Sequence, residues 1–135
     1  MSDDTVRDLV SSLFEKIGQG AAPAEIASLF SEDVDWFIAG DTENVPWIGR
    51  KAGRKGVAEF FRQIRELIAP ERFEVSDVLV KGSRAVVLGT LASRARSTGK
   101  LMETEFAFDL TVKNGLIVRY RMFEDSFAVA RAVVP

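Results

Sequence analysis

The main change in the hydrophobic period of the chain, from mostly helical spacing to alternation, comes near Pro70, and this change constrains the fold more than any other feature. Before Pro70, apolar residues recur at helical spacing, most regularly at Val57, Phe60, Phe61, Ile64, Leu67 and Ile68. After Pro70, which we expect to end this helix, apolar residues alternate with polar ones in four runs separated by turn residues. Helices followed by antiparallel strands predict an α+β fold.

Two further helices are expected before residue 30. The first begins at Thr5 and Asp8, which are spaced as in a capping box, and it ends near Gly18 or Gly20. Pro23 suits the first turn of the second, shorter helix.

Strands and one final helix complete the predicted elements. The strands are expected over 34–38, 72–80, 84–96, 101–112 and 116–124. The loop over 40–54 is long enough to suggest a function. Asp125 or Ser126 is expected to cap a short C-terminal helix, and Asp125 fits capping better than catalysis.

Turn lengths predict the register of the last two hairpins. A three-residue loop over 113–115 sets Leu110 opposite Val118, Phe108 opposite Tyr120, Phe106 opposite Met122 and Asp109 opposite Arg119. A four-residue loop over 97–100 sets Leu91 opposite Phe106, Gly89 opposite Phe108 and Arg94 opposite Glu103. One face of the sheet is then apolar and the other is mixed.

The chain has no cysteine and no histidine, which excludes thiol nucleophiles, histidine bases and the usual zinc sites. Acid/base chemistry would have to use Asp, Glu, Tyr or Lys. We expect no metal and no cofactor. A net charge of −2 argues against a nucleic-acid partner.

The chain length and the N-terminal sequence indicate how many domains to expect and where in the cell the protein should be. A chain of 135 residues is expected to form a single domain over 1–135. The start MSDDTVRDLV lacks the basic and apolar regions of a signal peptide, and no run approaches the length of a membrane span. We therefore expect a cytoplasmic protein that does not enter a membrane.

Three stretches together resemble a known family: FSEDVDWFIAG, PWIGRKAGRKGVAEFF and NGLIVRYRMFEDSFAVARAV. They are similar to the nuclear transport factor 2-like superfamily, in its SnoaL-like and ketosteroid-isomerase-like branch. The resemblance implies a cone, in which a curved antiparallel sheet wraps around three N-terminal helices, with a short C-terminal helix. It also implies a deep apolar pocket and a homodimer.

The catalytic residues known in this superfamily have no counterparts here. The tyrosine and two aspartates of the ketosteroid isomerases fall on Phe14, Ile38 and Phe108. The Asp-Arg-Asp arrangement of the limonene-type epoxide hydrolases falls on Leu91, Gly89 and Met122, and their supporting residues on Trp36 and Ile38. The resemblance thus implies a pocket without the known chemistry.

Aromatic and aliphatic residues are the candidates for contact with a ligand, although many would serve equally as core. The predicted pocket residues are Phe14, Trp36, Ile38, Trp47, Phe61, Leu91, Phe106, Phe108, Tyr120 and Met122. Tyr120 could also polarise a substrate, because a phenol near an apolar cavity needs a hydrogen-bond partner.

Acidic and basic residues around the first strand allow two readings each. Asp41 could be an acid/base in a new site arrangement, or a solvated loop carboxylate. Asp33 and Asp35 alternate with apolar residues and should point away from the pocket. The basic cluster of Arg50, Lys51, Arg54 and Lys55 could meet an anionic ligand or a partner's carboxylates, or could simply be solvated.

The leading hypothesis is a protein that binds a small hydrophobic molecule. One alternative is a lyase- or isomerase-type enzyme that acts on a polyketide- or terpenoid-like substrate. Another is a non-catalytic dimeric interaction module whose cavity is filled by side chains. A cavity with room for about 300 Å³ of ligand distinguishes a binding protein from a filled scaffold.

Overall fold

The computed structural model describes residues 3–135, and its helices and strands follow the expected order. The helices are α1 (Asp3–Gly18), α2 (Pro23–Ala27), α3 (Gly53–Leu67) and α4 (Ser126–Val133). The strands are β1 (Phe30–Ile38), β2 (Gly49–Ala52), β3 (Ile68–Lys81), β4 (Arg84–Ala95), β5 (Leu101–Lys113) and β6 (Leu116–Glu124). The α+β prediction is confirmed.

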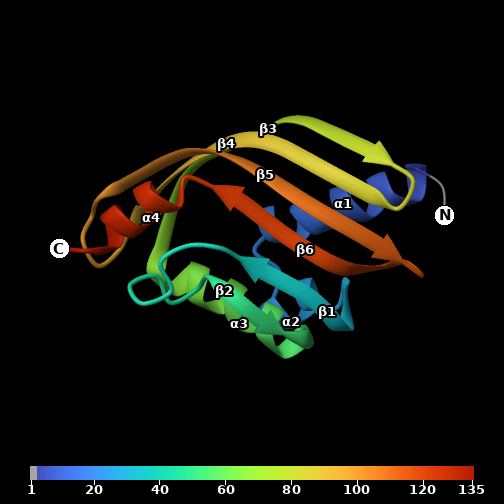
Figure 1. Ribbon diagram of the computed structural model, residues 1–135, viewed down its shortest axis with the longest axis horizontal. Helices are drawn as coiled ribbons and strands as arrows, with labels where there is room; N and C mark the ends of the chain where they lie inside the picture. The colour runs from blue at the N-terminus through green and yellow to red at the C-terminus, as the bar shows by residue number, and fades with distance from the viewer. Residues whose placement is uncertain (1–2) are drawn as a thin grey trace.

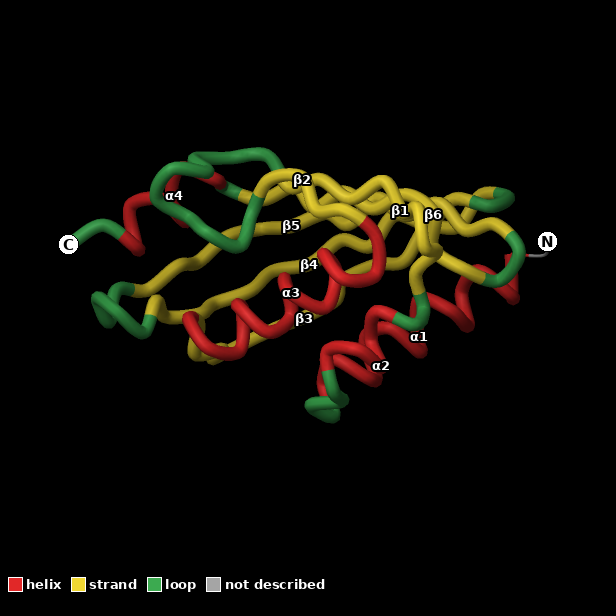
Figure 2. Tube along the Cα trace, turned by 90° about the horizontal axis from the view of Figure 1, so that it is seen from below, coloured by secondary structure: helices red, strands yellow, loops and turns green. Residues whose placement is uncertain are grey.

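One curved sheet holds all six described strands in the order β2-β1-β6-β5-β4-β3 (Figure 1). The helices α1, α2 and α3 lie on the same side of this sheet, and α4 lies at one end beside the β4–β5 hairpin (Figure 2). The sheet is not wholly antiparallel, because β1 runs parallel to β6. No hairpin joins these two strands, so no tight turn imposes an antiparallel pairing.

Three boundaries in the first half of the chain differ from the prediction. Helix α1 already includes Asp3, so Thr5 lies inside the helix instead of capping it. Strand β1 begins at Phe30, four residues before the predicted start. The predicted loop contains β2, which pairs with β1 through Gly49 opposite Ile38. The first half of the chain therefore contains more strand and less loop than predicted.

Pro70 does not end the third helix as predicted. Helix α3 ends three residues earlier, at Leu67, and Pro70 lies within strand β3. This strand is at the edge of the sheet and carries a bulge between Pro70 and Arg72. Proline is tolerated at an edge or a bulge because its missing N–H breaks no central ladder bond.

The predicted register of the last hairpin is wrong by two residues. The turn is the two-residue pair Asn114–Gly115, with φ values of 53° and 77°, as a type I′ turn requires. A bulge beyond Thr111 then shifts the ladder, so Phe108 pairs with Met122 and Leu110 with Tyr120 instead of the predicted partners. A shift of two residues preserves the face of each side chain.

The β4–β5 hairpin shows the same error for a different reason. Its loop covers 96–99, one residue earlier than predicted, because the Ala95 N–H donates to the Lys100 carbonyl at 3.1 Å. Gly89 therefore pairs with Phe106 and not with Phe108, while Arg94 pairs with Leu101 and Leu91 with Thr104. The apolar face still looks inward.

Asp125 caps α4 as predicted, since its carboxylate accepts a hydrogen bond from the Ala128 N–H at 3.0 Å. Replacing Asp125 by alanine removes this acceptor and should lower the free energy of unfolding by about 1 kcal/mol. Urea denaturation measures the loss. Asp125→Asn keeps an acceptor oxygen and serves as the control, so an equal loss in both variants would contradict a capping role.

Candidate functional site

A cavity of about 740 Å³ lies between the concave face of the sheet and the helices. Its lining residues come from α1, α3 and α4, from β1 and β3 to β6, and from the loops before β2 and after β4. Most are aromatic or aliphatic. Its polar side chains, among the described residues, are Arg65, Ser93, Arg96, Tyr120 and Glu124.

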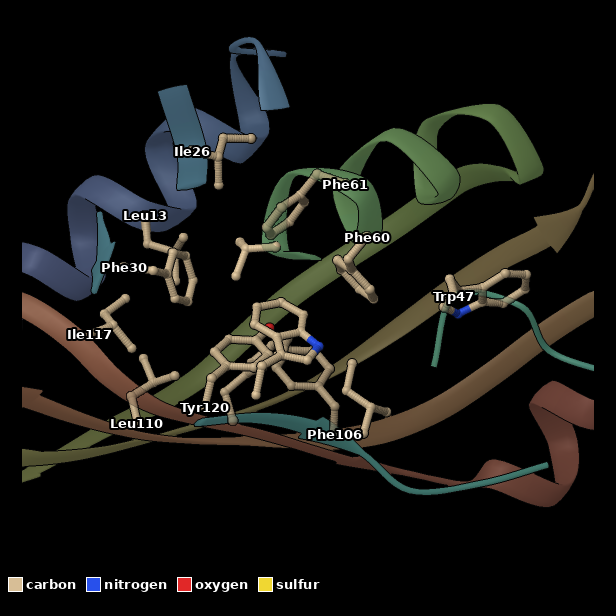
Figure 3. Close-up of a cluster of buried hydrophobic side chains, with 14 of the residues drawn as sticks. Leu13, Ile26, Phe30, Trp47, Phe60, Phe61, Phe106, Leu110, Ile117 and Tyr120 are labelled. Atoms are coloured by element: carbon tan, nitrogen blue, oxygen red, sulfur yellow. The ribbon is translucent and has the colours of Figure 1, made fainter. Parts of the chain in front are cut away.

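The aromatic residues of the site project from opposite sides (Figure 3). Phe60 and Phe61 reach down from α3, whereas Tyr120 and Phe106 rise from the sheet. Helical spacing places Phe60 and Phe61 on the apolar side of α3, and alternation places Tyr120 on the inner face of β6. Trp47 lies apart from this group, in the loop before β2.

Eight of the ten predicted pocket residues line the cavity. They are Phe14, Ile38, Trp47, Phe61, Leu91, Phe108, Tyr120 and Met122. Trp36 and Phe106 do not. Trp36 is fully buried and stacks on Tyr120, with ring centroids 4.0 Å apart, and Phe106 stacks on Phe73 at 4.8 Å. These two rings are themselves buried and pack against the lining residues Tyr120 and Phe73.

Tyr120 brings a hydroxyl to an otherwise apolar region. The residue is 3% exposed, and burial raises the pKa of its phenol far above the ordinary value. The hydroxyl therefore stays protonated. Within the described residues it has no hydrogen-bond partner, so it is available to donate to a ligand.

Asp41, predicted as the acid/base, does not lie on the cavity. Its carboxylate accepts hydrogen bonds from the Glu43 N–H at 3.2 Å and the Asn44 amide at 2.7 Å. These bonds close a local turn, as aspartate commonly does. The geometry gives the predicted catalytic role no support.

The acidic residues of β1 point outward, as the alternation indicated. Asp35 is bound by Arg50 at 2.8 Å and by Arg121 at 2.9 Å, and these guanidiniums lower the pKa of its carboxyl. Arg121 is the larger cause. Asp35 thus joins β1 to β2 and β6 on the outer face of the sheet.

The basic cluster spans β2 and the first turn of α3, and not only the loop before the helix, and most of it is explained by contacts within the chain. Arg50 binds Asp35, Lys51 donates to Gln63 at 3.1 Å, and Arg54 donates to the Phe30 carbonyl at 2.8 Å. Arg50 and Arg54 thus fasten β2 and the start of α3 to β1, and Lys51 joins β2 to α3. The cluster therefore needs no anionic ligand to account for it.

Glu124 is the functional candidate that the sequence reasoning missed. It is the last residue of β6, lines the cavity, and has a pKa raised to about 7 by burial and, to a lesser extent, by the negative charge of Asp125. The period of two along β6 places Tyr120, Met122 and Glu124 on one face. That alternation is the signal in the sequence that points to Glu124, although the capping position of Asp125 directly follows it.

The described residues hold neither a cluster of metal ligands nor a membrane-spanning helix. No group of three or more acidic side chains there comes together as a metal site would require. No described helix is long and apolar enough to cross a membrane.

Comparison with known proteins shows the family of the chain. The family model of the SnoaL-like domain matches residues 10–120. The chain belongs to the SnoaL-like domain family. The resemblance predicted from three stretches of sequence is thereby confirmed. No curated protein sequence is similar enough to count as a match.

Solved structures share the fold of this SnoaL-like domain. An NTF2-like protein of Burkholderia xenovorans is 25% identical, with a TM-score of 0.89 and 99% of each chain covered. An NTF2-like protein of unknown function from Burkholderia pseudomallei is 24% identical, with a TM-score of 0.86 and 100% of each chain covered. TerC, crystallised with polyporic acid, is 19% identical, with a TM-score of 0.80 and 96% and 98% covered. The cone-like architecture of the NTF2-like proteins is confirmed.

The SnoaL-like domain has apolar side chains at the positions where the ketosteroid isomerases carry catalytic groups, as predicted from the sequence. Phe14, Ile38 and Phe108, which stand at the ketosteroid-isomerase positions, line the cavity as hydrophobic walls. Glu124 is the carboxylic acid that lines it, among the described residues. Acid/base chemistry in this cavity would therefore depend on Glu124.

Proposed function

We propose that this SnoaL-like protein binds a small, mainly apolar organic molecule in its cavity. The observation that carries the proposal is the cavity itself: about 740 Å³, walled mostly by apolar side chains and furnished with few polar ones. Ligand sites for small molecules have this size and this composition. The open space between sheet and helices favours this proposal over an interaction module whose cavity is filled by side chains.

Binding of a neutral apolar fluorophore, N-phenyl-1-naphthylamine, tests the proposal. Its fluorescence should rise and saturate as protein is added. Met122→Trp fills part of the cavity and should weaken this binding about tenfold, a loss of about 1.4 kcal/mol. A fluorescence titration gives both dissociation constants.

The neighbouring residue provides a matched control. Phe123 is on the same strand, is 54% exposed and lies outside the cavity lining, so Phe123→Trp should leave the dissociation constant unchanged. Absence of saturable binding to the unaltered protein would overturn the proposal. Equal weakening in both variants would place the probe elsewhere.

A second candidate function is lyase- or isomerase-type proton transfer on a polyketide- or terpenoid-like substrate. Glu124 favours it, because a carboxyl with a pKa of about 7 can both accept and release a proton near neutral pH. In this mechanism the ionised carboxylate removes a proton from a carbon next to a carbonyl, and the resulting acid returns it elsewhere. The polyporic acid of TerC belongs to a structural neighbour and supports only an organic guest of this general kind.

Tyr120 would act at a distance from that proton. Glu124 lies four positions further along β6, about 13 Å away between backbones, and its charge contributes, after burial, to the raised pKa of the Tyr120 phenol. The two groups therefore contact different parts of a ligand: Tyr120 anchors one part through its hydroxyl, and Glu124 exchanges the proton at another. With a substrate in hand, Glu124→Gln should abolish turnover, whereas Tyr120→Phe should mainly raise KM.

A further inference from the structure

Two arginines differ from all the others in the chain. Ten of the twelve bind a carboxylate, a backbone carbonyl or an aromatic ring of the described residues. Arg65 and Arg96 make no such interaction there, although this chain is rich in acidic residues. Both line the cavity. The cavity thus holds the arginines that the fold leaves unpaired.

The fold brings these two arginines to the same corner. Arg65 lies in the last turn of α3, and Arg96 directly follows β4. The Arg96 N–H donates to the Leu67 carbonyl at 2.9 Å, which holds the two backbone segments together. The ladder pair of Ile68 with Ala95 continues this contact. Two guanidiniums therefore leave neighbouring backbone at the rim of one cavity.

No carboxylate of the described residues neutralises this corner. The nearest acids in sequence are already engaged: Glu66 binds Arg62 at 2.6 Å, and Glu71 binds Arg94 at 2.7 Å. The Glu124 carboxylate forms no ion pair with Arg65 or Arg96. An oxyanion supplied by a ligand would meet five N–H donors on each arginine in a planar arrangement that suits two-point binding.

We infer that the ligand of the cavity is an amphipathic anion, whose oxyanion group binds Arg65 and Arg96 at the rim while its apolar body lies inside. This inference rests on the proposed function and narrows it to a class of ligand. In the sheet register Glu124 is level with Gly89, six residues before the end of β4 at Ala95, and Tyr120 is level with Ala85, further from that end. The apolar body of an anion bound at Arg65 and Arg96 would thus extend toward the Glu124 carboxyl and the Tyr120 hydroxyl.

A pair of fluorophores that differ only in charge tests the inference. The probe 8-anilinonaphthalene-1-sulfonate is N-phenyl-1-naphthylamine with one added sulfonate. At low salt the unaltered protein should bind the sulfonate about tenfold more tightly than the neutral probe, and added salt should reduce the difference. In Arg65→Gln/Arg96→Gln the preference should disappear, while the affinity for the neutral probe stays the same.

A second double variant controls for net charge. Lys81→Gln/Lys113→Gln removes the same two charges from exposed positions that do not line the cavity, and it should retain the preference. Equal affinities of the unaltered protein for both probes would overturn the inference and leave the proposed function standing. Loss of preference in both double variants would also overturn it, whereas binding of neither probe would overturn the proposed function itself.

Discussion

Replacing Gly89 by alanine should lower the free energy of unfolding by at least about 3 kcal/mol, or prevent folding altogether. A Cβ added at this position would stand 2.1 Å from the Glu74 carbonyl oxygen and 2.5 Å from the Phe106 ring. The first of these atoms is backbone, so no rotamer change relieves the clash. Overpacking that forces backbone to move lies at the upper end of the usual range of 1–3 kcal/mol or beyond it.

The close approach has a structural cause. Gly89 pairs with Val75 on one side and Phe106 on the other, and the β3 ladder shifts between Val75 and Asp77. Such a bulge increases the local twist, which brings the backbone of β3 over β4. The glycine is needed here for space.

Gly82→Ala is the matched control for the Gly89 variant. Gly82 has φ of 61° and nothing within 4 Å of an added Cβ, so its replacement incurs only the strain of the left-handed conformation, about 1 kcal/mol. Urea denaturation of both variants gives the comparison. Equal losses would show that the β3–β4 contact at Gly89 relaxes easily, contrary to the prediction.

The order of elements could be predicted from the sequence because it depends on local periodicity. Helical spacing around Phe60 and Phe61, and alternation along β4 to β6, are each visible within ten residues. The strand pairings could not be predicted to the residue. They depend on a bulge after Thr111 and on a loop that starts at Arg96, and neither leaves a clear mark in composition.

The register errors left the predicted cavity-facing residues on the correct face of the sheet, because both errors were shifts of two residues. Tyr120 and Met122 remained on the inner face, and the ion pair of Asp109 with Arg119 survives at 3.2 Å as a diagonal contact. Asp109 is also bound by Arg84 through two hydrogen bonds of 2.9 and 2.7 Å, which lower the pKa of its carboxyl. A slip of one residue would have reversed both faces.

The chemistry of the site was harder to predict than its walls. Apolar residues of an inward face line a cavity whichever exact neighbours they have, so most of the wall could be identified. The state of a carboxyl depends on tertiary burial, which periodicity does not report. Asp41 looked suitable because it follows β1, yet its own turn engages it, whereas Glu124 is desolvated by elements distant in sequence.

Glu124→Gln should make the protein less sensitive to pH and more stable above neutrality. The pKa of Glu124 is raised from 4.5 to about 7 in the folded protein. Below pH 4.5 the carboxyl is protonated in both the folded and unfolded chains, so it contributes no pH dependence. Between pH 4.5 and 7 the unfolded chain ionises first, and the folded state loses about 1.4 kcal/mol per pH unit from this group.

Above pH 7 both states are ionised and the accumulated loss stays near 3 kcal/mol. Glutamine has nearly the same shape but cannot ionise, so the stability of Glu124→Gln relative to the unaltered protein should rise by that amount from pH 4.5 to 8. Urea denaturation at several pH values measures the difference. Glu105→Gln, at an exposed position on β5, controls for the general effect of removing a carboxylate.

A pH-independent difference between the unaltered protein and Glu124→Gln would show that solvent reaches this carboxyl freely. That result would also remove the basis for proton transfer at neutral pH, because an ordinary glutamate is almost fully ionised there. The predicted dependence would instead establish that the cavity holds a carboxyl close to half-protonation. Binding of an apolar guest beside Glu124 would displace more water, raise its pKa further and favour the acid form.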